Sequence, residues 1–387
     1  MRGQRSRHRA EDLPAWLTQG FRPFFLGAAV WGVVALGLWA FELAGGPSPP
    51  SRFDPLSWHI HEMLFGFVMA AVGGFLLTAI PNWTGRASVA GVPLAVLAGL
   101  WLLGRVVCAF SALIPGWLVV PADLAFAVAL EGVAARELSA AGNRRNYPLL
   151  VPVIVLAIAN LLMHLRVEAG WRLGVAAVIV LISVIGGRIV PVFTSNWLNA
   201  RGMAPVQRQI PWLTHAARGA LVAAMLGWVF LPDWHPLGLL LLAAAGLNLV
   251  RLARWRGVAT LAEPLLLVLH VGYLWLVAGV ALLGASLLTD VVPPAAAVHA
   301  LTAGPMGTMI LAVMTRATLG HTGRVLRADK VTMVIYALAS TSAVLRIAAA
   351  WASDGQTDLY EVAALAWVGA FGLFVVEYGP MLLAPRR

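Results

Sequence analysis

The amino-acid sequence predicts an all-α, polytopic membrane protein with about 12 transmembrane helices. Three observations support this fold class. Of the 387 residues, 60% are hydrophobic and 11% are charged, whereas a soluble domain carries about 25% charged residues. Apolar runs of about 20 residues, long enough to cross a bilayer, recur along the whole chain. The basic residues are concentrated in alternate loops.

Each apolar run is predicted to form one membrane-spanning helix. The loops between the runs are short, so we expect a single 12-helix transmembrane domain at residues 24–384, after a cytoplasmic N-terminal segment at residues 1–23. The expected spans are residues 24–44, 58–80, 89–110, 115–135, 148–165, 173–194, 214–231, 236–252, 263–285, 295–317, 331–351 and 359–384.

The basic residues predict the orientation of the chain. The net charge of +10 and the pI near 11.0 would also suit a nucleic-acid-binding protein. However, 21 of the 27 Lys and Arg residues lie at the termini or on one side of the predicted membrane, and only three lie in the opposite loops. By the positive-inside rule, both termini are cytoplasmic. An even number of spans agrees, and no nucleic-acid partner is expected.

Two of the predicted spans carry the same residues at the same spacing. Each contains a His, a Gly and a Thr-Gly-Arg triplet, and the two copies are 238 residues apart. These residues are His61, Gly66 and Thr84–Arg86 in the first copy, and His299, Gly304 and Thr322–Arg324 in the second. The span at 173–194 is a weaker third copy, four spans from each of the others. The sequence therefore predicts three four-helix units in a pseudo-threefold arrangement, with the chemistry at the repeats.

His59, His61 and Glu62 form the densest polar cluster in any predicted span. Imidazole is a good ligand for copper, iron and zinc, and Glu62 can orient an imidazole, relay a proton or cap the helix. Two His residues separated by one residue do not share a helical face, but both can converge on one ion where a helix begins. The alternative is an interfacial segment among lipid headgroups. Because ionisable residues within a membrane are usually functional, a ligand site is favoured.

Three further His residues are candidates. His299 is followed by Gly304 and Gly307, which allow close approach of a flat ligand or of another helix. His270 stands alone in an apolar span, where a core His bonded to a carbonyl and a cofactor ligand are equally plausible. His321 precedes the second Thr-Gly-Arg triplet and is a candidate metal ligand or part of an inner-side proton path. The triplets themselves fit helix C-caps facing the cytoplasm.

Arg105, Arg188 and Arg346 fall inside predicted spans, where an unpaired cation costs several kcal/mol. Acidic residues within the spans are few, and Glu62 and Asp123 are among them. The carboxylates of a bound cofactor, such as haem propionates, are suitable partners for Arg. Salt bridges between helices are the alternative. Cys108 is the only cysteine, and one Cys cannot build an intrachain disulfide, a thiolate zinc site or an iron–sulfur cluster. Any metal is therefore expected to use His, Met or carboxylate ligands.

Several longer blocks of the sequence resemble those of the NnrS family. The blocks are RPFFLGAA (22–29), WHIHEMLFGF (58–67), GFLLTAIPNWTGR (74–86), GGRIVPVFTSNW (186–197) and MILAVMTRATLGHTGR (309–324). This resemblance implies a bacterial inner-membrane protein that contains haem and copper and belongs to the nitric oxide response in denitrifying or nitrosatively stressed bacteria. It implies His59, His61, His299 and His321 as metal-site candidates without dividing them between haem and copper.

A looser likeness is to the catalytic subunit of haem–copper oxidases and nitric oxide reductases, which also has twelve helices in three groups of four. The consecutive His pair that such subunits carry after the sixth helix is absent, because residues 205–215 read PVQRQIPWLTH. An oxidase-type copper site is therefore not expected.

Together these features predict a redox protein for nitric oxide. Haem b is expected in the outer half of the bundle, with His61 and His299 as axial candidates and His270 as an alternative. Arg105 and Arg346 are candidates to hold its propionates. Copper is expected near His59 and His61.

Nitric oxide is expected to enter from the lipid and to be reduced or scavenged, with Glu62 as a possible proton donor. The electron donor, a quinol or a cytochrome, stays open. Two alternatives also stay open. One is a nitric oxide sensor or buffer without turnover, and the other is a transporter of copper, haem or a metal–nitrosyl species.

Overall fold

The computed structural model describes residues 13–352 and 355–387, and these residues form helices and connecting segments without a strand. Eleven of the described helices are long and apolar enough to cross a membrane, and Leu237–Ala253 is a shorter apolar helix. The all-α, multi-pass class is thereby confirmed, and a helix lies at each of the twelve predicted spans. Residues 1–12 of the predicted N-terminal segment lie outside the described residues.

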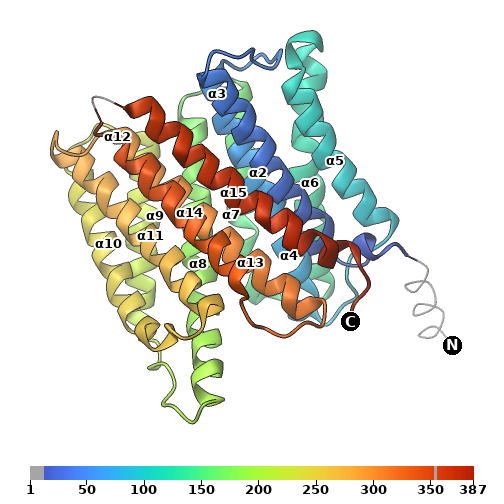
Figure 1. Ribbon diagram of the computed structural model, residues 1–387, viewed down its shortest axis with the longest axis vertical. Coiled ribbons are helices and arrows are strands. Elements are labelled where there is room, and N and C mark those ends of the chain that lie inside the picture. The colour runs from blue at the N-terminus through green and yellow to red at the C-terminus, as the bar shows by residue number, and fades with distance from the viewer. Residues whose placement is uncertain (1–12, 353–354) are drawn as a thin grey trace. The chain divides into compact units, whose positions relative to one another are not determined.

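The helices fall into two compact units. Figure 1 labels the helices in chain order. Unit 1 comprises residues 1–167, 314–325 and 371–387. Its complete helices are α2 (Phe21–Leu43), α3 (Pro55–His61), α4 (Met69–Thr84), α5 (Val92–Ala109), α6 (Gly116–Ala140) and α7 (Val151–His164). Within it, α2 packs on α4, α5 on α6, and α6 on both α4 and α7.

Unit 2 comprises residues 168–313 and 326–370. Its complete helices are α8 (Ala169–Asn199), α9 (Pro211–Phe230), α10 (Leu237–Ala253), α11 (Pro264–Leu288), α12 (Pro294–Thr302) and α14 (Lys330–Ala348). Helices α13 (Thr308–His321) and α15 (Gln356–Leu383) are each shared between the units. Helix α10 packs on α9 and α11, and α12 packs on α11 and α14. The arrangement of three four-helix units stays a prediction.

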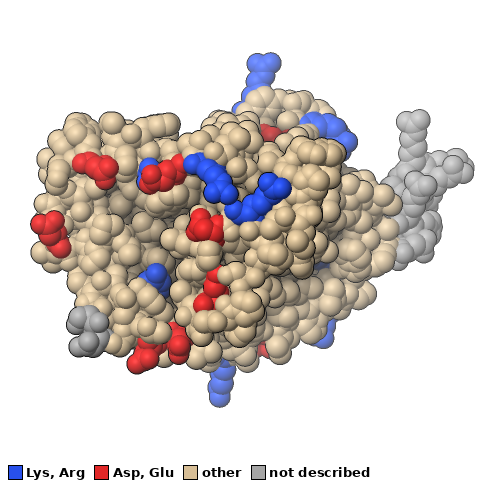
Figure 2. Space-filling model, turned by 90° about the horizontal axis from the view of Figure 1, so that it is seen from above, with Lys and Arg blue, Asp and Glu red and all other residues tan. Residues whose placement is uncertain are grey.

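The surface of the molecule matches a lipid environment. Large hydrophobic side chains are exposed on many of the helices, including Val96, Trp117, Trp212, Leu239 and Val376. On the face that Figure 2 shows, acidic and basic residues are few, and most of the surface is formed by other residues. Because exposed apolar patches of this extent are unfavourable in water, they indicate contact with lipid.

The two Thr-Gly-Arg triplets follow helix ends, as their sequence predicted. Gly85 is the C-cap of α4, with φ of 68°, and Gly323 follows α13 with φ of 80°. Glycine suits this left-handed conformation because it has no side chain to clash with the backbone. The triplets are therefore structural in this chain.

The first and last transmembrane helices have neighbouring ends. Arg22 at the start of α2 donates from Nη1 to the carbonyl oxygens of Leu382 (2.8 Å) and Ala384 (2.6 Å), at the end of α15. Both ends therefore lie on the same side of the membrane, as an even number of crossings requires. That this side is the cytoplasm stays a prediction from the Arg distribution.

A π-helical segment follows the first His of both sequence repeats. Residues Glu62–Val68 form the π-helix η2 between α3 and α4, and residues Ala303–Gly307 form the π-helix η6 between α12 and α13. In unit 1, η2 packs on α2 and α5; in unit 2, η6 packs on α11 and α14. Because π-helices are rare and frequently occur at functional sites, the repeat is a structural one with a candidate role in function.

Helix α3, which carries His59 and His61, begins with an N-cap. The Asp54 carboxylate accepts from the backbone N–H of Ser57 at 3.0 Å, and Pro55 follows at the first helical position. Both features favour helix initiation. The hydrogen bonds from Ser57 hold the pKa of Asp54 below its ordinary value.

We expect Asp54→Ala to destabilise the protein by about 1 kcal/mol at pH 7, as loss of an N-cap does. The lowered pKa means that the cap stabilises the fold above the unfolded-state pKa of about 3.9 and loses this effect as the pH falls through the folded-state value. The difference in melting temperature between the wild type and Asp54→Ala should therefore shrink at pH 3. Asp54→Asn is the control, because its amide oxygen accepts the same bond at every pH. A difference that does not depend on pH would contradict this assignment.

Candidate metal centre

Four helices of unit 1 place charged and polar side chains in one buried cluster. His61 ends α3, Glu62 begins η2, Arg105 lies on α5 and Asp123 lies on α6. Glu62 and His61 have no exposed surface, and Arg105 and Asp123 expose 2% and 3%. The cluster is completed by Asn160 and His164 of α7. Ionisable groups inside a membrane are costly unless they are paired, and here each finds a partner.

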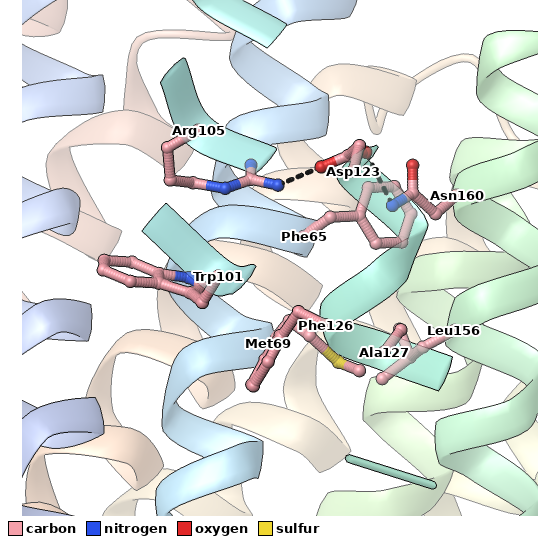
Figure 3. Close-up of a pocket in the computed structure, with 9 residues that line it drawn as sticks. All are labelled: Phe65, Met69, Trp101, Arg105, Asp123, Phe126, Ala127, Leu156 and Asn160. Atoms are coloured by element: carbon pink, nitrogen blue, oxygen red, sulfur yellow. Dashed lines mark hydrogen bonds and ion pairs between the residues drawn. The ribbon is translucent and has the colours of Figure 1, made fainter. Parts of the chain in front are cut away.

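The Asp123 carboxylate is the centre of the cluster. Its Oδ2 accepts a hydrogen bond from Asn160 Nδ2 at 2.8 Å and lies 3.0 Å from Nε2 of both His61 and His164. Its Oδ1 pairs with Nη2 of Arg105 (Figure 3). Asp123 thus connects its own helix, α6, to α3, α5 and α7.

Glu62 and Arg105 form the second half of the cluster. Nη1 of Arg105 donates to Glu62 Oε2 at 2.6 Å, and the same oxygen accepts from Trp31 Nε1 at 2.8 Å. Glu62 Oε1 lies 3.1 Å from Nδ1 of His61. The helix-to-helix salt bridge, the alternative to a propionate contact, is therefore what the structure shows for Arg105. Its Nε is buried without a hydrogen-bond partner in the described part of the chain.

The side chains of Glu62, Asp123 and Arg105 together carry a net negative charge, which one more cation would neutralise. Two carboxylates, Glu62 and Asp123, face one guanidinium, so one negative charge is unbalanced. Both ring nitrogens of His61 face acceptor oxygens, since Nε2 also lies 2.9 Å from Asn160 Oδ1. A proton on His61 satisfies both acceptors and balances the charge. A metal ion at Nε2 would replace that proton, and metal binding commonly releases protons in this way.

Four ligand atoms in this cluster lie close enough together to hold a metal ion. One atom each from His61, Cys108, Asp123 and His164 lies within 4.8 Å of the other three, and Cys108 is fully buried. Imidazole and thiolate together suit copper or zinc. The sequence predicts His, Met or carboxylate ligands for any metal, and this candidate site adds the Cys108 thiol to such a set.

A small cavity adjoins the cluster on the side of α5 and α6 (Figure 3). Arg105, Asp123 and Asn160 line its polar side, and the side chains of Phe65, Met69, Trp101, Phe126, Ala127 and Leu156 line the rest. It has space for about one water-sized molecule. A water-sized space, lined mostly by apolar residues, therefore adjoins the candidate metal site.

Two tryptophans contact the π-helix beside the cluster. The backbone carbonyl of Gly66 accepts a hydrogen bond from Trp101 Nε1 at 3.0 Å, across from α5. A side chain at Gly66 would collide with the indole of Trp31. Trp31 donates in turn to Glu62, so the glycine lets two tryptophans close over the cluster.

The structure separates the two His residues of the first repeat. His59 stacks on Trp39 of α2, with ring centroids 4.9 Å apart, while His61 enters the cluster. The reason is geometric, because residues two apart on a helix point to different faces. His59 does not belong to the group of four ligand atoms.

In the second repeat, His299 of α12 has a different environment. Its Nδ1 donates to the carbonyl oxygen of Ala295 at 2.7 Å, and Nε2 has no hydrogen-bond partner among the described residues. Arg346 of α14 is near enough to interact electrostatically with His299. Its guanidinium lies 4.2 Å from the ring centre of Tyr360, and Nη1 is buried without a partner in residues 13–352 and 355–387.

The glycines after His299 accommodate tryptophan rings of unit 2. A side chain at Gly304 would contact Trp275, and one at Gly307 would contact Trp367. His270 lies 3.0 Å from the hydroxyl of Thr194 through Nε2. The ring of His321 contacts that of Phe21 in a tilted arrangement, with the ring centroids 5.5 Å apart. Within the described residues, His270, His299 and His321 do not belong to any group of three or more metal-ligand side chains.

Sequence reasoning missed three members of the site: Cys108, His164 and Asn160. Asp123 was noted only as a possible partner for Arg. The signal that could have found it is its position in the apolar run GWLVVPADLAFAVAL, where a lone carboxylate needs a cation or a metal.

A model of one protein family, described as NnrS protein, matches residues 15–386 of the chain. A search of curated proteins found no match to the chain.

Proposed function

Because the chain belongs to the NnrS family of membrane proteins associated with the nitric oxide response, we propose that it binds haem and copper and that it reduces or scavenges nitric oxide. The observation that carries the proposal is the convergence of four metal-ligand atoms on the buried cluster of unit 1. The lipid bilayer concentrates small apolar molecules such as nitric oxide, and a bacterial inner membrane is the proposed location.

Copper fits the donor set of the cluster. Thiolate and imidazole are soft or intermediate ligands that favour copper, and the unbalanced negative charge favours a cation. His61, Cys108, Asp123 and His164 would hold the ion, while Glu62 orients the imidazole of His61 through Nδ1. A bound copper ion would supply one-electron redox chemistry and a position for nitric oxide.

Haem fits His299 and Arg346. A ligand imidazole usually donates its other N–H to a backbone carbonyl, as His299 does to Ala295, which leaves Nε2 as the ligand atom. Nη1 of Arg346, which has no hydrogen-bond partner in the part of the chain that the structure describes, is a suitable donor to a propionate. His61 and His270 would be the alternative residues to hold the haem. For Arg105, a propionate contact would use Nε, because both Nη atoms already pair with carboxylates.

The residues around the cavity have roles that follow from their contacts. Phe65, Trp101 and Phe126 exclude bulk water from the space beside Asp123. Reduction of two nitric oxide molecules to nitrous oxide and water consumes two protons and two electrons. Glu62 is the proposed proton donor, since it contacts His61 directly, and Arg105 holds its second oxygen. A quinol or a cytochrome is the proposed source of electrons.

The test is an optical spectrum of the detergent-purified protein, oxidised and then reduced, before and after nitric oxide is added. We expect a Soret band that shifts with nitric oxide, because an open coordination position is required for binding. His299→Ala should abolish the band, and His235→Ala, which replaces an exposed His of unit 2, should leave it unchanged. Absence of a Soret band after expression with ample haem would remove haem chemistry from the proposal.

His61→Ala decides between the two roles of His61. Loss of the Soret band would assign His61 to haem, whereas a retained band with lost copper would assign it to the metal cluster. Steady consumption of nitric oxide with a reductant separates turnover from the sensor or buffer alternative. Metal uptake into vesicles that contain the protein would favour the transporter instead.

A further inference from the structure

Unit 2 contains a buried guanidinium whose hydrogen bonds are incomplete. Arg251, in the last turn of α10, exposes 2% of its surface. Its Nη1 donates to the hydroxyl of Tyr273 at 2.8 Å and to Asn248 Oδ1 at 3.0 Å. Its Nε and Nη2 are buried and have no partner among the described residues. The rings of Trp255 and Tyr273, with centres 5.6 and 5.9 Å from Cζ, flank the guanidinium and fix its position.

The neighbours of this guanidinium are also cationic. Gly187 of α8 marks the meeting point, because a side-chain carbon there would collide with Arg251 Nη2 and lie 3.8 Å from Arg218 Nη2. Arg218 of α9 is half-buried, and its Nε has no partner in the described part of the chain. Arg188 lies within electrostatic range of Arg218. Among the described residues, neither Arg251 nor Arg218 forms an ion pair with a carboxylate.

This arrangement is the reverse of the one at Arg105. There, two carboxylates surround one guanidinium; here, positive charges meet without a carboxylate. A buried polar group without a partner destabilises the fold, and more so when it is charged. Like charges at close range in a medium of low dielectric add repulsion. An anion between the guanidinium groups would satisfy the N–H donors and remove the repulsion.

We propose that Arg251 and Arg218 bind an oxyanion, with Nε and Nη2 of Arg251 and Nε of Arg218 as the donors. The planar fork of a guanidinium matches two oxygens of one oxyanion, which favours phosphate-like or carboxylate-like groups over a spherical ion. The anion is either a small inorganic ion or the phosphate of a phospholipid headgroup, since both present the same oxygens. The site stands apart from the proposed nitric oxide chemistry, because none of its residues belongs to the metal cluster.

The loop before α9 adjoins the site. Gln209 donates from Nε2 to the carbonyl oxygen of Gly187 at 3.0 Å, which ties residues 200–210 to the meeting point of the two arginines. This loop is on the side that the Arg distribution predicts to be cytoplasmic. The oxyanion therefore binds from the cytoplasmic face of unit 2.

The test uses the full-length protein in detergent and inorganic phosphate as the probe. Phosphate replaces chloride at constant ionic strength while the melting temperature is measured. We expect a saturable rise in the wild type, because a ligand that binds only the folded state stabilises it. Arg251→Gln and Arg218→Gln should each raise the half-saturating phosphate concentration at least about tenfold. Arg208→Gln is the control, because Arg208 is an exposed arginine of the same loop.

A second measurement identifies the source of the anion. Native mass spectrometry of the wild type should show an anionic phospholipid, lost in Arg218→Gln, if the headgroup is the ligand and phosphate has no effect. Arg218 is half-buried, so this variant serves even if Arg251→Gln does not fold. The proposal is overturned if the wild type neither responds to phosphate nor retains a phospholipid, or if both arginine variants behave like Arg208→Gln.

Discussion

Replacing Arg105 by leucine is expected to destabilise the protein by about 3–5 kcal/mol, the usual cost of removing one partner from a buried ion pair. The guanidinium balances Glu62 and Asp123, which expose 0% and 3% of their surfaces. Without it, two carboxylates remain inside the bundle with only imidazole, indole and amide donors. The free energy of unfolding in mixed detergent micelles, titrated with SDS, measures the effect.

Two further variants sharpen this result. Arg136→Leu removes an arginine of the same unit whose side chain is 69% exposed and pairs with Glu137, so its effect should stay below about 1 kcal/mol. Adding Glu62→Gln to Arg105→Leu should recover part of the loss, because one of the stranded charges disappears. An unfolding free energy that is the same for Arg105→Leu and Arg136→Leu would show that the buried ion pairs do not form.

Copper affinity should fall by more than about 100-fold in Cys108→Ser and in His164→Ala, because loss of groups that only support metal ligands already costs 10–100-fold. Each variant removes one of the four atoms that converge in unit 1. Competition between the purified protein and a chromophoric Cu(I) chelator gives the affinity.

The matched control for copper is His235→Ala, since His235 is an exposed imidazole outside the cluster. It should bind copper as the wild type does. If Cys108→Ser and His164→Ala also keep wild-type affinity, the cluster is a structural ion network and the copper lies elsewhere. Retained affinity in Cys108→Ser alone would reduce the ligand set to the two imidazoles and Asp123.

The transmembrane fold could be predicted from sequence because its signal is local. Each span is a continuous apolar run, which can be recognised without any knowledge of packing, and the Arg-rich loops predict an orientation in the same way. The two His-containing repeats were also visible, and both contain a π-helix in the structure. The π-helices themselves could not be predicted, because they depend on contacts such as that of Trp101 with the Gly66 carbonyl.

The site was only partly predictable, because its members come from separate helices. His61 and Glu62 stand out in one short segment, and their neighbour His59 shared that signal although its ring stacks on Trp39. Cys108, Asp123 and His164 lie on three different, largely apolar helices. They are brought together only when α5, α6 and α7 pack side by side, which no spacing in the chain reveals.

The π-helix after His61 also sets the rotational register of its transmembrane segment. Before the π-helix in the chain, His61 faces the ion cluster. After it, Gly73 of α4 faces the ring of Phe126, and Gly74 faces the ring of Phe25. An α-helix turns by about 100° for each residue, so the wider π turns shift one face relative to the other by a corresponding angle. The same segment can therefore present a polar ligand to one neighbour and a smooth glycine surface to another, with no break in the helix.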